Sequence, residues 1–71
     1  MNISDIKYIE KRLKEIYRNK NIEIISEGCE EFYLICIIID GWKYRYIILK
    51  ECDSVGAVIN YIVNDLKKVI Q

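Results

Sequence analysis

The dipeptide Asp40-Gly41 is the feature that most constrains how this chain can fold, because it separates two runs of β-prone residues. The run before it is unbroken from Phe32 to Ile39, and the run after it extends from Trp42 to Lys50. Asp-Gly between two such runs is among the strongest signals for a two-residue β-hairpin. The sequence therefore predicts two antiparallel strands joined at residues 40–41.

The hairpin also predicts which side chains share a face, since alternate residues of a strand point to opposite sides of the sheet. One face carries apolar and aromatic residues, namely Tyr33, Ile35, Ile37, Trp42, Tyr44 and Tyr46. The other carries apolar residues and two basic ones, namely Phe32, Leu34, Cys36, Ile38, Lys43, Arg45, Ile47 and Leu49. We expect helices to cover the second face, with the reverse assignment left open. The aromatic face would then remain as an apolar interface.

Two amphipathic segments flank the strands and predict helices. The first runs from about Ile3 to Lys20 with Asn2 as its N-cap, and its apolar face consists of Ile6, Ile9, Leu13 and Ile16. The second follows a cap at Asp53 or Ser54, and its apolar stripe consists of Val55, Val58, Ile59, Ile62, Leu66 and Val69. A short strand from Ile22 to Ser26 precedes the hairpin. The sequence thus predicts a single α+β domain, residues 1–71, in which two helices pack on one face of a three-stranded antiparallel meander in the order α-β-β-β-α.

Charge is balanced overall, with eleven basic and eleven acidic residues, so any electrostatic function depends on how the charges are distributed. The predicted topology gathers acidic residues at the end of the sheet opposite the hairpin, namely Asp5, Glu27, Glu30, Glu31, Glu51 and Asp53. It gathers basic residues at the hairpin end, namely Arg18, Lys20, Lys43, Arg45, Lys67 and Lys68. Helix dipoles account for the charges at helix ends. They do not account for Glu27, Glu30 and Glu31, which lie in a strand connection.

The sequence offers no recognisable catalytic residues. It contains no His, which is the usual general base near neutral pH and the commonest metal ligand. Its three glycines are scattered, and no phosphate-binding loop is present. The cysteines lack metal-site spacing: Cys36 is expected to be a small core residue, and a disulfide between Cys29 and Cys52 is left open. We expect a protein that is not an enzyme and has no cofactor.

The first residues do not have the pattern of a signal peptide, because charges recur every few positions. The longest apolar run, Phe32 to Ile39, is too short to span a bilayer. We therefore expect a cytoplasmic protein with no membrane partner, located in the host cytoplasm if it is viral.

Two resemblances bear on function. The α-β-β-β-α order resembles the double-stranded RNA-binding domain, but the start of the second helix lacks that family's lysines. The chain also resembles small virus-encoded anti-CRISPR proteins, in particular a type II-A inhibitor of an RNA-guided nuclease. The matching residues are Met1, Asn2, Ile3, Asp5, Asp40, Gly41, Tyr44, Glu51, Asp53 and Ser54. The resemblance implies an acidic decoy that occupies the DNA-reading surface of the nuclease, although those inhibitors are strongly acidic and this chain is neutral.

We therefore expect a small protein-binding inhibitor that docks on a host nuclease or other defence protein. Its contact residues would be those of the acidic end and the aromatic face: Glu27, Glu30, Glu31, Glu51, Asp53, Tyr33, Trp42, Tyr44 and Tyr46. An alternative is nucleic-acid binding by the strand of Trp42, Tyr44 and Tyr46 together with the basic residues Lys20, Lys43 and Arg45. Against it, the aromatic side chains and the two basic ones of that strand point to opposite faces. A third possibility is a homodimer that buries the aromatic face.

Overall fold

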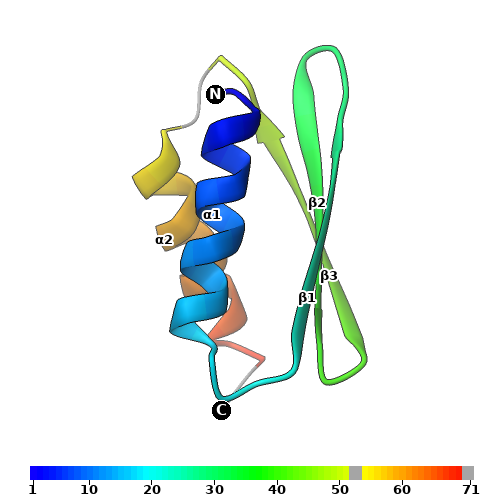
Figure 1. The fold of residues 1–71 in the computed structure, drawn as a ribbon, viewed down its shortest axis with the longest axis vertical. Coiled ribbons are helices and arrows are strands. Elements are labelled where there is room, and N and C mark those ends of the chain that lie inside the picture. Colours follow the sequence, from blue (N-terminus) through cyan, green and yellow to red (C-terminus); the bar gives the residue numbers. More distant parts are fainter. Residues whose placement is uncertain (52–53, 70–71) are drawn as a thin grey trace.

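The computed structural model of the chain describes residues 1–51 and 54–69, and the elements in this part follow the predicted order (Figure 1). They are α1 (Ile3–Ile16), β1 (Ile22–Gly28), β2 (Phe32–Ile39), β3 (Trp42–Leu49) and α2 (Val55–Leu66). The strands form one antiparallel sheet in the order β1-β2-β3. Both helices lie on the same side of this sheet (Figure 1). The predicted α-β-β-β-α architecture is confirmed.

Helix α1 begins with reciprocal hydrogen bonds that its sequence encodes. The Asn2 side chain accepts a bond from the Asp5 backbone N–H at 3.1 Å, and the Asp5 carboxylate accepts one from the Asn2 N–H at 2.9 Å. The helix ends at Ile16, earlier than the expected end at Lys20, because Tyr17 leaves the helical conformation with φ −106° and ψ 34°. Ile6, Ile9 and Leu13 are fully buried, as the periodicity predicts, whereas Ile16 at the end of the helix is 39% exposed and was wrongly included in the apolar face.

The hairpin turn has the geometry that its sequence predicts. Asp40 has φ 51° and Gly41 has φ 88°, so both turn residues occupy the left-handed region used by the tightest two-residue turns. The expected register is confirmed, since Ile39 pairs with Trp42 and Ile37 pairs with Tyr44. The turn thus fixes which residues of β2 and β3 share a face.

The expected choice of covered face was wrong, and the helices cover the opposite side of the sheet. Its buried residues are Tyr33, Ile35, Ile37, Ile39, Tyr46 and Ile48. The physical reason lies in β1, where Glu23 pairs with Ile38 and Glu27 pairs with Leu34. Helices on that side would have to bury two carboxylates, which is costly without charged partners. The covered side instead receives Ile22, Ile24 and Ser26 from β1.

Helix α2 completes the core from the other end of the sequence. Its N-cap is Ser54, whose hydroxyl accepts a hydrogen bond from the Ala57 N–H at 3.2 Å. Val58, Ile62 and Leu66 are buried, but Val69 lies beyond the end of the helix and is 56% exposed, so its place in the predicted stripe was wrong. Both helices run from the end where β1 joins β2 to the end with the hairpin turn (Figure 1). Both helices therefore start at the end of the sheet opposite the hairpin and finish at the hairpin end, as predicted.

Candidate protein-binding surfaces

The side of the sheet away from the helices carries the main apolar surface, which we call the open face. Its residues, strand by strand, are Glu23, Ile25 and Glu27; Phe32, Leu34, Cys36 and Ile38; and Lys43, Arg45, Ile47 and Leu49. Ile25 is 58% exposed and Ile47 is 65% exposed, while the residues of β2 are half-buried between their neighbours. An apolar surface of this extent is typical of a contact region.

Charges border the open face in an ordered way. Glu23 and Glu27 lie along the outer strand β1, whereas Lys43 and Arg45 lie along the outer strand β3. All four are exposed, and the ion pairs within residues 1–51 and 54–69 join other side chains. The face therefore has an acidic edge, an apolar centre and a basic edge. Glu23 was not among the predicted contact residues, although its alternation with Ile22 and Ile24 could have placed it here.

Four exposed glutamates lie at the end of the sheet opposite the hairpin: Glu27, Glu30, Glu31 and Glu51. We call this group the acidic end. The Lys50 backbone N–H donates to the Glu31 carbonyl at 3.1 Å, which holds the end of β3 against the β1–β2 connection. Glu30, Glu31 and Glu51 line a depression of about 360 Å³ together with Leu49 and Lys50. The four glutamates lie at the end of the sheet where the strand order predicted them, whereas Asp53 lies outside the described residues.

Positive groups also lie at this end: Lys50 lines the same depression, and the Met1 ammonium donates a hydrogen bond to the Lys50 carbonyl. The ammonium group of Lys50 is 4.8 Å from the centroid of the Tyr33 ring, a cation–π contact on the covered side of the sheet. None of the four glutamates forms an ion pair with another described residue. The acidic end is thus a surface of net negative charge on a neutral chain.

The expected aromatic interface is not an exposed face. Tyr33 and Tyr46 are each only 8% exposed, and Tyr44 is half-buried. The Tyr46 hydroxyl donates a 2.6 Å hydrogen bond to Asp65, and burial together with this bond raises the pKa of Tyr46. Trp42 alone of the four is well exposed, at 72%, because it lies at the hairpin end of β3. These aromatic residues mainly form core rather than contact surface.

The basic residues of the nucleic-acid hypothesis do not converge. Lys20 lies 3.9 Å from the Asp40 carboxylate, so its charge is partly balanced. Lys43 and Arg45 extend from the open face, whereas Trp42 belongs to the opposite side of the same strand. A stacking residue and the two phosphate-binding candidates therefore face different directions.

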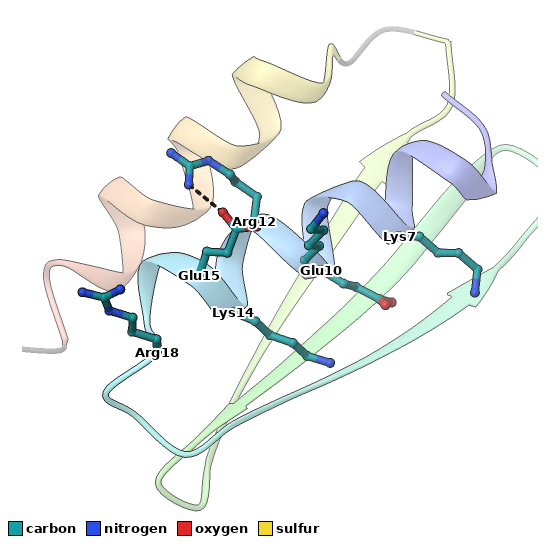
Figure 2. Close-up of a pocket in the computed structure, with 7 residues that line it drawn as sticks. Lys7, Glu10, Arg12, Lys14, Glu15 and Arg18 are labelled. Carbon is teal, nitrogen blue, oxygen red and sulfur yellow. Dashed lines mark hydrogen bonds and ion pairs between the residues drawn. The ribbon is translucent and has the colours of Figure 1, made fainter.

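Two further depressions lie away from the acidic end. One follows the outer surface of α1, where Arg12 lies 3.3 Å from Glu15 and where Lys7 and Lys14 extend away from the helix (Figure 2). Its lining mixes both signs of charge. The other, of about 600 Å³, lies between β3 and α2 and includes Ile47 and Tyr61. The Tyr61 ring packs edge-to-face on that of Tyr46, with centroids 6.1 Å apart.

The described residues also bear on metal and membrane sites. In residues 1–51 and 54–69, no three His, Cys, Asp or Glu side chains are grouped so that they could hold a metal ion. Cys29 and Cys36 have free thiols, and Cys36 lies on the open face rather than in the core as expected. Cys52, the proposed partner of Cys29, lies outside the described part. Neither described helix is long and apolar enough to cross a membrane.

Comparison of the chain with protein-family models, with curated proteins and with solved structures found no match. Function must therefore be argued from the surfaces themselves.

Proposed function

We propose that the protein is a small non-enzymatic inhibitor that binds another protein through its acidic end. The observation that carries this proposal is the group of four exposed glutamates that lack ion-pair partners among the described residues. Binding to a basic surface would give these charges partners and would also accelerate association.

Helix dipoles do not explain this group. Favourable interaction with a dipole falls off within the first turn of a helix, and Asp5 already occupies that position in α1. Glu30 and Glu31 lie in the connection between β1 and β2, and Glu27 lies within β1. Their gathering supports a role in contact with a partner.

The partner that this chemistry fits is a protein that holds nucleic acid in a basic groove. Closely spaced carboxylates resemble a phosphate backbone in charge, so they can compete for lysine and arginine side chains. An RNA-guided, DNA-cutting nuclease is such a protein, and the resemblance to anti-CRISPR proteins points to the same class. We propose that the inhibitor acts by occupying the surface that the DNA would contact.

A matched pair of charge reversals tests the proposal. Glu31→Lys changes the acidic end, whereas Glu15→Lys makes the same change of net charge on the outer surface of α1. We expect the first variant to lose most of its binding to a guide-loaded type II-A nuclease and the second to retain it. DNA cleavage with increasing amounts of each variant provides the readout. Equal inhibition by both variants, or no inhibition by the unmodified protein, would contradict the proposal.

The nucleic-acid alternative is favoured by the exposure of Lys43 and Arg45, which have no ion-pair partner among the described residues. If these side chains contact phosphates, binding should weaken with salt and the salt dependence should fall in a Lys43→Ala variant. A gel-shift titration of single-stranded DNA and RNA at several salt concentrations measures both effects. No shift at low salt would exclude this alternative.

A further inference from the structure

The open face carries acidic residues along one edge and basic residues along the other, so two copies of the face can pair opposite charges. Each cross-strand row runs from β1 through β2 to β3, and one of them contains Glu23, Ile38 and Lys43. An acidic residue thus begins this row and a basic residue ends it. The next row places Arg45 on the same basic edge, and the row after it places Glu27 on the same acidic edge.

We propose that the open face binds a second copy of this chain, and that the two sheets pack face to face about a two-fold axis parallel to β2. Such an axis places β1 of each copy opposite β3 of the other while keeping each row at the same height. Glu23 then lies opposite Lys43 of the second copy, and the same contact recurs on the other side of the axis. Arg45 of each copy lies between Glu23 and Glu27 of the other.

The alternative two-fold axis, across the strands, is disfavoured by the same charges. It would place β1 on β1 and β3 on β3, so that Glu23 and Glu27 would face glutamates and Lys43 and Arg45 would face basic residues. Like charges placed opposite one another at an interface oppose binding. The charge order therefore selects one orientation of the second copy.

The centre of the open face fits sheet-on-sheet packing. The residues of β2 that lie on the axis are Phe32, Leu34, Cys36 and Ile38, all of them weakly polar or apolar. Aligned sheets stack about 10 Å apart with strand directions within about 30° of each other, and alternate side chains fill the space between them. The parallel alignment that this axis gives to the two copies of β2 falls within that range. Ile25 and Ile47 are more than half exposed in the single chain and would become buried.

The size of the face predicts the strength of association. Three strands with a spacing of about 4.8 Å and a rise of about 3.3 Å per residue cover roughly 14 Å by 26 Å. This footprint is smaller than the roughly 800 Å² that each partner contributes to a standard stable interface. We therefore expect a dimer that dissociates in the micromolar range.

Pairing through the outer strands is the main competing arrangement. Two copies of β1 joined edge to edge would bring Glu23 and Glu27 of one copy close to the same glutamates of the other, which is unfavourable. Two copies of β3 could pair without opposing like charges. In that arrangement, however, Glu23 would lie two strands away from the contact, and Cys36 would lie far from its counterpart. Substitution of Glu23 and cross-linking of Cys36 therefore distinguish the face-to-face dimer from a β3 pair.

A charge exchange tests the proposed contact. Glu23→Lys alone and Lys43→Glu alone each place like charges opposite one another in two symmetric positions. We expect each variant to be a monomer at concentrations where the unmodified chain is a dimer. An equimolar mixture of the two should dimerise again, and so should the double variant Glu23→Lys/Lys43→Glu. Sedimentation from about 5 µM to about 1 mM covers the expected range of dissociation constants.

Cross-linking supplies an independent measure of the geometry. In a chain with Cys29→Ser and Cys52→Ser, Cys36 is the remaining thiol, and the axis places it opposite its own counterpart. A short bismaleimide should yield covalent dimer, and the added Glu23→Lys change should abolish it. A strict monomer at the highest concentration, a dimer unaffected by Glu23→Lys, or no recovery in the mixture would overturn the proposal.

The dimer and the acidic-end proposal can fail separately. Glu31 lies outside the open face, so the Glu31→Lys variant is expected to dimerise like the unmodified chain. A chain that dimerises but does not inhibit the nuclease refutes only the acidic-end proposal. A chain that inhibits the nuclease but stays a monomer at about 1 mM refutes only the dimer.

Discussion

The two faces of this sheet differ less in their central strand than in their outer strands. On β2, the covered face has Tyr33, Ile35, Ile37 and Ile39, and the open face has Phe32, Leu34, Cys36 and Ile38. Either set could form a hydrophobic core. The outer strands add Glu23, Glu27, Lys43 and Arg45 to the open face alone. Burial is therefore decided by the edges of the sheet, because a charge is costly to bury and an isoleucine is not costly to leave exposed.

The largest effect should come from truncating adjacent isoleucines on opposite faces. Ile37 is fully buried and Ile38 is half-buried on the open face. We expect Ile37→Ala to lower the free energy of unfolding by about 3 kcal/mol, because it removes packed methyl groups and leaves a cavity. Ile38→Ala should lower it by about 1 kcal/mol or less. Urea unfolding of both variants measures the difference, and equal losses would contradict the assignment of the two faces.

The next effect concerns the hydrogen bond of the covered face. Tyr46→Phe removes the bond to Asp65 and leaves a partly buried carboxylate with one acceptor unfilled, so we expect a loss of about 1–2 kcal/mol. Tyr61→Phe is the matched control, since no hydrogen bond of its hydroxyl is seen among the described residues.

The same tyrosine predicts a dependence of stability on pH. The pKa of Tyr46 is raised in the folded chain by burial and by its bond to Asp65, so folding favours the neutral phenol. This contribution is fully present below the unfolded value near 10 and is lost as the pH rises above it. Thermal unfolding from about pH 8 to pH 11 should thus show a steeper alkaline decline for the unmodified chain than for Tyr46→Phe. Parallel declines would show that Tyr46 is not responsible.

A smaller effect should come from the turn that sets the register of both faces. Gly41 has φ 88°, where a Cβ is unfavourable, so Gly41→Ala should destabilise the fold by about 1 kcal/mol. Gly56 lies in α2 with open space around its Cβ position, so Gly56→Ala should stabilise the fold by about 0.5 kcal/mol. Thermal unfolding of the two variants should therefore give shifts of opposite sign. Shifts of the same sign would be inconsistent with the observed turn.

The smallest effect on the fold should come from the open face itself. Ile47 is 65% exposed, so Ile47→Glu should change the free energy of unfolding by less than about 0.5 kcal/mol when the chain is monomeric. It should nevertheless weaken dimer formation, because the new carboxylate would lie opposite Glu27 of the second copy. Unfolding at low concentration, followed by sedimentation at high concentration, separates the two effects. A large loss of stability in dilute solution would mean that Ile47 belongs to the core.

Local signals were sufficient to predict most of the fold from the sequence. The Asn2 cap, the Asp40-Gly41 turn and the Ser54 cap each depend on residues close together in the chain, and all three are confirmed. The covered face was predicted wrongly because it depends on the register of β1 against β2. That register is set by the longer connection at residues 29–31, which lacks the specific turn signal of Asp40-Gly41.

The candidate contact residues also divide into those whose positions were predicted correctly and those whose positions were not. The acidic residues lie at one end of the sheet because of the strand order. The positions of Glu30, Glu31 and Glu51 could therefore be predicted from the sequence. Tyr33 and Tyr46 were expected on an exposed face because the helices were expected to cover the face of Phe32, Leu34, Cys36 and Ile38. Their burial follows from which side the helices cover, and that choice required the charges of β1.

The meander also determines the order in which the core can close. Every strand pairs with its neighbour in sequence, whereas α1 and α2 pack together from opposite ends of the chain. During synthesis, the whole sheet leaves the ribosome before α2 does. Until Val58, Ile62 and Leu66 emerge, part of the covered face has no partner, and both sides of the sheet are exposed to water. Glu23 and Glu27 along β1 then oppose edge-to-edge pairing of two nascent chains through that strand.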